Sequence, residues 1–292
     1  MAQGFSGLLV LDKPTGMTSR AAVDRALKWF PRGTRIGHAG TLDPLATGVL
    51  VLCVGAATRL TEYVQAMPKV YRAGITLGAT SDTDDADGTI TTHANVTAPT
   101  RETIEISLGA FLGVIEQIPP AYSAAKVAGR RAYALARKGY DVDLQPRKVR
   151  IDRIEILAYE YPRLELLVHC GKGTYIRSLA RDLGLWLGCG GHIHALRRLA
   201  IGSFTEADAL SLQVDAEMAR SRLLPAWRAI QDSPPVRVTD ADAARLRNGG
   251  AILALVAVGM EEFAVADSAG DLVAIVEAID DRWQPRKVMP GC

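Results

Sequence analysis

The chain of 292 residues has no long hydrophobic run, because its longest apolar stretches, near residues 48–57 and 251–260, reach only about ten residues. A helix needs roughly 20 apolar residues to cross a bilayer, so no membrane span is predicted. The first residues lack a basic region followed by a long apolar stretch, which argues against a secretory signal. The four cysteines form no C-x-x-C pair. These absences favour a globular protein of a reducing, cytoplasmic compartment.

The net charge is also small, at +2 overall, but the charged residues are unevenly distributed along the chain. Residues 126–153 carry nine basic and three acidic side chains, whereas residues 231–292 carry six basic and ten acidic ones. The basic segment includes Lys126, Arg130, Arg131 and Lys148. It is either a surface that binds phosphates or a solvated hairpin or helix, and the sequence alone leaves both interpretations open.

The chain lacks a complete signature for a nucleotide or a metal ion. Residues 171–174, Gly-Lys-Gly-Thr, do not have the spacing of a phosphate-binding P-loop. The acidic turn at 82–88 falls out of step with a calcium-binding loop. Cys189, His192 and His194 would need a fourth ligand to bind zinc, and alternating histidines also occur in ordinary strands. We therefore predict no cofactor and no metal.

Hydrophobic periodicity, capping residues and turn residues predict a mixture of strands and helices. We expect strands at 7–11, 48–54, 70–77, 111–117, 149–161 and 163–170. We expect helices from Thr18 or Ser19 to about 30, from Thr100 to about 110, over 129–138, and from a Thr174 cap to 187. After a linker at 233–235, we expect a helix from Thr239 or Asp240 to about 248, and strands at 251–258, 263–266 and 272–278.

The segment 37–55, GHAGTLDPLATGVLVLCVG, is the most informative part of the chain. It places Asp43 in a short loop between glycines, directly before an apolar strand. Pro44 removes a backbone donor and pushes Asp43 toward an extended conformation, and glycines permit close backbone approach. On local chemistry alone, Asp43 is either a carboxylate facing a pocket or part of an ordinary Asp-Pro turn.

Five segments, in order, resemble the motifs of the TruB family of tRNA pseudouridine synthases. They are 7–19 (GLLVLDKPTGMTS), 37–50 (GHAGTLDPLATGVL), 69–72 (KVYR), 118–124 (IPPAYSA) and 173–179 (GTYIRSL), and the resemblance covers about residues 5–205. It implies an enzyme that isomerises uridine to pseudouridine at position 55 in the T-loop of tRNA. Such an enzyme flips the base out of its stack and uses an aspartate nucleophile without a cofactor.

The resemblance also implies an α/β (α+β) fold with a mixed, largely antiparallel sheet. A catalytic domain would span residues 1–232 and include a basic RNA-binding insertion at 119–150 that closes over the T-loop. In position and size, residues 233–292 resemble the small PUA-like domain of the family, although an acidic domain is unusual for a phosphate-binding surface. The implied partner is the T-arm of tRNA, and we expect a monomer with no obligate protein partner.

Four residues match catalytic positions of the family: Asp43, Tyr71, Asp85 and Arg177. Asp43 must stay ionised in its pocket although burial raises a carboxyl pKa, and Arg177 is implied as its partner. Asp85 would hold the same arginine from its other side, and Tyr71 would stack on the uracil and take part in proton transfer. Without the resemblance, Arg177 would be an exposed helix residue, Asp85 a turn acid and Tyr71 a half-buried strand residue.

The remaining implied positions bind RNA. Tyr175 would form a second aromatic wall, Leu196 would contact the base, and His38 would help to hold the opened RNA loop. Lys13 would support the floor of the site. Phosphate contacts are assigned to the basic segment, through Lys126, Arg130, Arg131 and Lys148.

Two other functions remain open: a pseudouridine synthase acting on another RNA, and a tRNA-folding chaperone that does no chemistry. The sequence also leaves open whether Asp43 attacks the uracil or the ribose, or assists a glycal-like intermediate.

Overall fold

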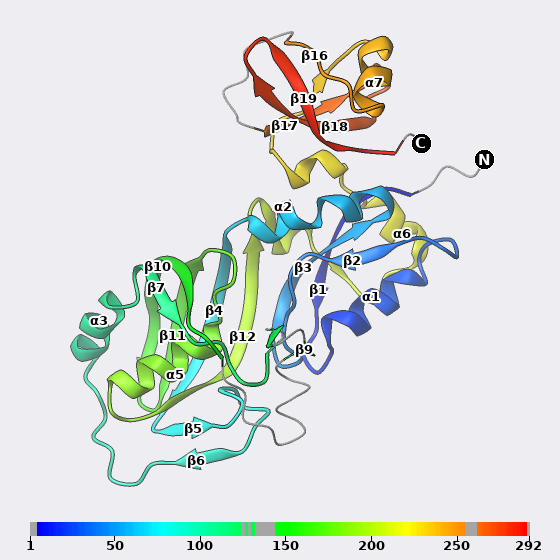
Figure 1. Ribbon diagram of the computed structural model, residues 1–292. Helices are drawn as coiled ribbons and strands as arrows, with labels where there is room; N and C mark the ends of the chain where they lie inside the picture. Colours follow the sequence, from blue (N-terminus) through cyan, green and yellow to red (C-terminus); the bar gives the residue numbers. More distant parts are fainter. Residues whose placement is uncertain (1–4, 124–125, 128–129, 132–143, 255–261, 291–292) are drawn as a thin grey trace.

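The computed structural model describes residues 5–123, 126–127, 130–131, 144–254 and 262–290. Its main body is a ten-stranded, largely antiparallel sheet (Figure 1). The strands follow one another in the order β14 (Leu210–Ser211), β1 (Gly7–Lys13), β3 (Thr47–Val54), β12 (Gly191–Ile201), β4 (Lys69–Leu77), β11 (Arg163–Cys170), β10 (Arg147–Glu160) and β7 (Gly113–Gln117). Off this path, β2 (Ile36–His38) pairs with β3, and β13 (Phe204–Thr205) pairs with β12. The predicted α/β fold with a mixed, largely antiparallel sheet is confirmed.

Both faces of the central strands are buried, because a separate apolar core packs on each face. Successive side chains of a strand point alternately to the two cores. On β1, Leu9 and Leu11 face the core that contains α1 (Ser19–Leu27), α3 (Arg101–Gly109), α5 (Ile176–Trp186) and α6 (Ala216–Ser221). Leu8 and Val10 face the opposite core, which contains the 3-10 helix η1 (Gly55–Leu60) and α2 (Thr61–Ala66). Among the described residues, no helix is long and apolar enough to cross a membrane.

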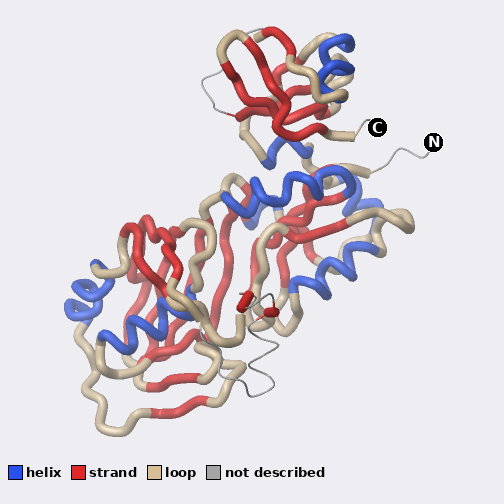
Figure 2. Tube along the Cα trace, viewed as in Figure 1, coloured by secondary structure: helices blue, strands red, loops and turns tan. Residues whose placement is uncertain are grey.

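A second sheet of five strands lies at the C-terminal end of the chain, next to α2 (Figures 1 and 2). Its order is β15 (Val236–Arg237), β17 (Glu262–Ala266), β18 (Leu272–Ile279), β19 (Arg282–Val288) and β16 (Ile252–Leu253), with α7 (Asp240–Arg247) packed against it. Ala264, Ile275 and Met289 of this part share a buried cluster with Leu60 and Val64 of the main body. Apolar burial therefore joins the two sheets.

Most predicted elements are confirmed, and their bounds differ at the ends. Helix α1 ends at Leu27 because the next three amides bond three residues back, which tightens the last turn before Pro31. The prediction of Thr174 as a helix cap is wrong. Helix α5 begins at Ile176, and the Thr174 hydroxyl instead donates to the carbonyl of Gly171 at 3.2 Å.

The predicted helix at 129–138 lies largely outside the described residues. Its described part is wrong, because Arg130–Arg131 is strand β9, paired with β8 (Lys126–Val127). Of the strand predicted at 251–258, the structure describes β16, and residues 255–258 lie outside the described ranges. The prediction missed β12, β19, α6 and the hairpin of β5 (Ala79–Ser81) and β6 (Ile90–Thr92) that carries the acidic turn.

Candidate active site

A cavity of about 270 Å³ opens beside the segment that carries Asp43. Strands β4 and β12 and the start of α5 form its other walls, so residues far apart in the sequence meet there. Five of the predicted site residues line it: Asp43, Tyr71, Tyr175, Arg177 and Leu196. A mixed apolar and charged lining of this size suits a small planar group held by a few polar contacts.

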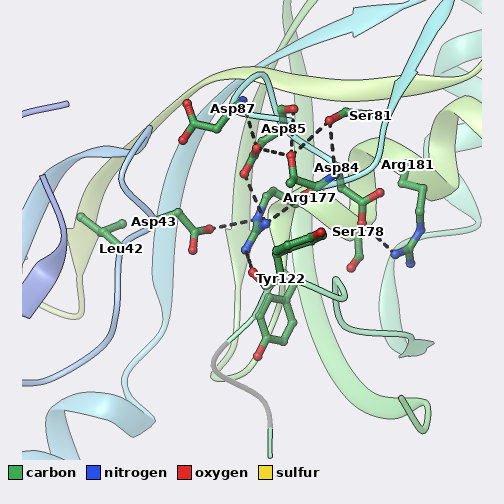
Figure 3. Close-up of polar contacts among 12 residues, drawn as sticks. Leu42, Asp43, Ser81, Asp84, Asp85, Asp87, Tyr122, Arg177, Ser178 and Arg181 are labelled. Atoms are coloured by element: carbon green, nitrogen blue, oxygen red, sulfur yellow. Dashed lines mark hydrogen bonds and ion pairs between the residues drawn. The ribbon is translucent and has the colours of Figure 1, made fainter. Parts of the chain in front are cut away.

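Asp43 forms an ion pair with Arg177, whose Nε lies 3.0 Å from Asp43 Oδ2. On its other side, Arg177 Nη1 lies 3.2 Å from Asp85 Oδ2 (Figure 3). The Arg177 side chain is only 5% exposed and that of Asp85 only 6%, whereas the Asp43 side chain is 34% exposed. Arg177 is thus a buried cation between two carboxylates, and Asp43 is the one that opens to the cavity.

Two backbone carbonyls complete the environment of Arg177. Nη1 donates to the carbonyl of Thr83 at 2.9 Å, and Nη2 donates to that of Tyr122 at 3.0 Å. Asp85 is held in turn by the Thr83 hydroxyl at 2.6 Å and the Asp87 amide at 3.1 Å. These contacts fix the guanidinium before any ligand binds, which is the preorganisation that electrostatic catalysis requires.

Burial raises the pKa of Asp43 above its usual range, and the neighbouring Asp85 carboxylate adds to the rise. The charges of Arg177 and Lys13 oppose it. The balance leaves a carboxylate whose charge is poorly solvated. Such a group is more reactive toward an electrophile than a fully hydrated carboxylate.

Lys13 lies beneath the Asp43 loop and is completely buried. Its ammonium donates to the carbonyls of Pro14 at 2.8 Å, Met17 at 2.6 Å and Pro44 at 3.4 Å. Burial lowers the pKa of Lys13 to about 8, although the Asp43 charge opposes the change. Lys13 therefore ties the residue after Asp43 to the end of β1 and brings a positive charge under the carboxylate.

Ser19 holds the same loop from the residue before Asp43, and the sequence analysis missed it. Its hydroxyl donates to the carbonyl of Leu42 at 3.0 Å and accepts from the Leu42 amide at 2.8 Å. The amide of Gly16 donates to the Pro44 carbonyl at 2.8 Å. Asp43 is thus anchored on both sides by the first turn of α1 and the segment before it.

Tyr71 of β4 faces the cavity beside a buried arginine that the sequence analysis also missed. Arg198 of β12 donates from Nε to the Val49 carbonyl at 2.7 Å and from Nη2 to the Gly40 carbonyl at 3.1 Å. Its Nη1 lies 3.5 Å from the Tyr71 hydroxyl. Burial raises the pKa of Tyr71 despite this cation, so the hydroxyl stays protonated near neutral pH.

The remaining predicted residues lie around the cavity or away from it. His38 ends β2, just before the residues that line the cavity. Lys148 is exposed on β10. Lys126, Arg130 and Arg131 lie on the β8–β9 hairpin, where the structure describes their strand positions only.

The residues considered for a metal have other partners. His192 and His194 bond the Ala79 carbonyl at 3.2 Å and the Thr76 hydroxyl at 3.1 Å, and Cys189 contacts the Gly190 carbonyl at 3.3 Å. Across the part of the chain that the structure describes, no group of three or more His, Cys, Asp or Glu side chains is placed to hold a metal ion.

Two family models match this chain. Residues 28–176 match the model described as "TruB family pseudouridylate synthase (N terminal domain)", and residues 177–223 match "tRNA pseudouridylate synthase B C-terminal domain". Proteins named tRNA pseudouridine synthase B are similar over most of the chain. That of Caulobacter sp. (strain K31) is 45% identical over 86% of this chain and 82% of its own length. That of Bradyrhizobium diazoefficiens is 47% identical over 85% of this chain and 74% of its own length.

Solved structures share the fold. "Crystal Structure of a Cbf5-Nop10-Gar1 Complex" has a TM-score of 0.71 and 26% identity, covering 98% of this chain and 84% of that one. "Structure of H/ACA RNP bound to a substrate RNA containing 2'-deoxyuridine" has the same TM-score at 24% identity, covering 98% of this chain and 85% of that one. A similarity at the lower identity shows the fold alone.

Proposed function

The chain belongs to the TruB family of pseudouridylate synthases, and we propose that it isomerises the uridine at position 55 in the T-loop of tRNA. The family and the enzyme class predicted from the five motifs are confirmed by the matching family models and relatives. The tRNA substrate follows from the name that these relatives carry.

The observation that carries the proposal is the Asp43–Arg177 ion pair at the cavity, with Asp85 behind it. Forming pseudouridine requires breaking the N-glycosidic bond, rotating the uracil and rejoining it to the ribose through carbon C5. Asp43 is the nucleophile or anionic stabiliser that this exchange needs, because its carboxylate opens to the cavity. Arg177 favours the ionised form of that carboxylate and holds it at the cavity.

Tyr71 and Leu196 supply the surfaces for the flipped base. Both are nearly buried and both line the cavity, so a planar ring can stack on the tyrosine and contact the leucine. Tyr71 acts in its neutral form, as a hydrogen-bond donor or as a proton relay at C5. Tyr175 forms the opposite wall, held in place because the Gln117 amide bonds both its backbone NH at 2.8 Å and its carbonyl at 3.0 Å.

Taking the base out of a folded RNA arm costs a few kcal/mol, which contacts with the RNA backbone must offset. We assign these contacts to the basic insertion at 119–150, through Lys126, Arg130, Arg131 and Lys148. His38 helps to hold the opened loop. Residues 1–232 then form the catalytic domain, and residues 233–292 form a PUA-like domain whose acidic charge restricts it to a secondary role in binding.

The test is tritium release from a tRNA transcript labelled at uracil C5, because isomerisation replaces the C5 hydrogen by the glycosidic bond. The parent protein, Asp43→Asn and Asp24→Asn are compared, the last being a matched change at an exposed acid of α1. We expect release by the parent and Asp24→Asn alone, and none when the T-loop uridine is replaced by cytidine. The tRNA affinity of Asp43→Asn should stay within about tenfold, or ~1.4 kcal/mol.

Other outcomes would replace the proposal. Release from an unrelated stem-loop, but not from the T-arm, would indicate a synthase for another RNA. Tight tRNA binding without release by any variant would favour the chaperone function. Equal release by the parent and Asp43→Asn would remove Asp43 from the chemistry.

A further inference from the structure

Helix α5 carries a second arginine, Arg181, one turn after Arg177. Each of its nitrogens has a partner: Nη1 lies 2.9 Å from Asp84 Oδ2, Nη2 donates to the Ile118 carbonyl at 2.9 Å, and Nε lies 2.9 Å from Asp182 Oδ1. Arg181 does not line the cavity and contacts no group assigned to the chemistry. Figure 3 shows it directed at Asp84, beside the Asp43–Arg177–Asp85 group.

Arg177 and Arg181 connect the same two segments of the chain. Each contacts an aspartate of the acidic turn, Arg177 at Asp85 and Arg181 at Asp84. Each also donates to a carbonyl between β7 and β8, at Tyr122 and at Ile118 respectively. Residues four apart lie on one face of a helix, so the two guanidinium groups form a double clamp between the turn and the start of the proposed RNA-binding insertion.

The acidic turn is fixed in space at Asp84. This residue has a φ of 61°, in the left-handed region that a non-glycine residue seldom adopts. Its carbonyl accepts from the Ile193 amide of β12 at 3.1 Å, and its side chain is only 12% exposed. The backbone of Asp84 is therefore held against the central sheet, and its nearly buried carboxylate lies beside Arg181.

Arg181 supplies one of the positive charges that offset the carboxylates of this region. Three carboxylates, of Asp43, Asp84 and Asp85, face the cations of Lys13, Arg177 and Arg181. Asp84 also interacts electrostatically with Arg177, and burial raises its pKa. The half-buried Asp182 lies beside Arg181 as a further acid. Without Arg181, the Asp84 carboxylate would interact more strongly with Arg177. The interaction of Arg177 with Asp43, which the proposed function requires, would then be weaker.

We infer that Arg181 is a positioning residue for the reaction: it neutralises Asp84 and holds the carbonyl of Ile118, so that Arg177 remains paired with Asp43. This inference rests on the proposed function. Arg181 lies outside the cavity, so its effect on the reaction should appear as a change in the pH at which Asp43 ionises.

The groups that face Asp43 determine how its ionisation responds. They are Arg177 of α5, Asp85 of the acidic turn, Lys13 of β1 and Tyr71 of β4. Removing Arg181 leaves Asp84 to share Arg177, so Asp43 loses part of its stabilising charge and needs a higher pH to ionise. A cation as close as Arg177 is to Asp43, at 3.0 Å, lowers a carboxyl pKa by about one to three units. Partial loss should therefore shift the acid limb by roughly one pH unit.

The experiment measures single-turnover tritium release from the labelled tRNA, with enzyme in excess, from about pH 5 to pH 9. It compares the parent with Arg181→Met, Arg181→Lys and the double variant Arg181→Met/Asp84→Asn. The control is Arg101→Met, which breaks an exposed pair with Glu105 on the surface of α3. We expect Arg181→Met to shift the acid limb upward and to lower the rate by up to about tenfold at pH values below the acid limb of the parent, with tRNA affinity changed less than about threefold.

Two variants distinguish neutralisation from a general structural role. Arg181→Lys keeps the charge and should restore most of the parent profile. The double variant removes the carboxylate together with its partner and should return the acid limb to the parent position. Thermal melting of each variant shows that the rates come from folded protein. If Arg181→Met does not fold, the double variant keeps the inference falsifiable, because a shifted acid limb in a variant that retains the balance of charge would contradict it.

Clear results would overturn the inference. An acid limb in Arg181→Met at the same pH as in the parent and Arg101→Met would show that Arg181 does not act on Asp43. A limb that stays shifted in the double variant would overturn the claim that Arg181 acts by neutralising Asp84. An inactive parent would instead refute the proposed function itself, so the two failures are distinguishable.

Discussion

Gly48 lies in the strand that follows Asp43, between two neighbouring strands, and replacing it by alanine should disturb fold and site together. It lies opposite Lys13 on β1 and Arg198 on β12. Its φ of 97° lies in the region that favours glycine, and a Cβ there would lie 2.2 Å from the Arg198 carbonyl oxygen. That oxygen belongs to the backbone of a central strand, so it cannot give way as a flexible side chain would.

The expected cost has two parts. An L-residue at this φ costs roughly 1–2 kcal/mol, and forcing a methyl group into a packed strand interface costs about 1–3 kcal/mol more. Gly48→Ala should therefore lower the free energy of unfolding by roughly 2–5 kcal/mol, and the Tm by on the order of 10 °C. Turnover should fall by about 100-fold, because a shift near 1 Å in β12 would move Arg198 from its contact with Tyr71.

Gly33→Ala is the matched control. Its φ of 92° is almost the same, but no atom lies within 4 Å of the position that a Cβ would occupy. This variant should show the backbone strain alone, with a Tm loss of a few degrees and near-parent turnover. Thermal melting and tritium release on both variants separate strain from collision. A Gly48→Ala protein that melts and turns over like Gly33→Ala would refute the reasoning, since the contact with the Arg198 carbonyl would then cost nothing.

Three further predictions concern charge. Neutralising Arg130, Arg131 and Lys148 together should weaken tRNA binding. In filter binding between about 50 and 200 mM salt, the slope of log affinity against log salt concentration should fall in magnitude by up to about three. An unchanged slope would mean that these side chains do not reach phosphates. Because the pKa of Asp43 is raised in the fold, its contribution to stability is present at low pH and lost as pH rises through that pKa. The difference in Tm, Asp43→Asn minus parent, should therefore become more positive between about pH 4 and pH 8. A difference that stays constant over this range would contradict the raised pKa. Lys13→Met should lower the free energy of unfolding by about 3 kcal/mol or more, seen in urea melts, because three carbonyls lose their buried donor; parent-like stability would show that water replaces the ammonium.

The parts of the fold that could be predicted depend on short-range patterns. Strands β1 and β3 are continuous apolar runs, and the turn between Gly40 and Gly48 follows from its glycines and Pro44. The Thr18 and Thr100 caps are local hydrogen bonds, to the amides of residues three positions later. For these elements the neighbouring residues contain nearly all of the necessary information.

Strand β12 could not be predicted, because its character depends on its neighbours in the sheet. Its sequence mixes histidines, arginines and apolar residues, yet it lies between β3 and β4 in the centre of the sheet. Arg197 and Arg198 are adjacent, and the pleat sends them to opposite faces. Arg197 pairs with Asp12 and Glu206 at a partly exposed site, whereas Arg198 is buried beside Tyr71. Only the register with β4 decides which arginine belongs to the site.

The acidic turn at 82–88 shows the same limit for chemistry. Its spacing excludes a calcium loop, but nothing local indicates what its carboxylates bind. Asp84 and Asp85 pair with arginines on α5, about a hundred residues later, and the Ile193 amide of β12 bonds the carbonyl of Asp84, whose φ is positive. Local sequence thus specifies a cluster of negative charge, and tertiary structure supplies the neutralising cations. Changes on α5 that alter charge should consequently affect the ionisation of Asp43 before they affect the fold, whereas changes within the turn should affect both.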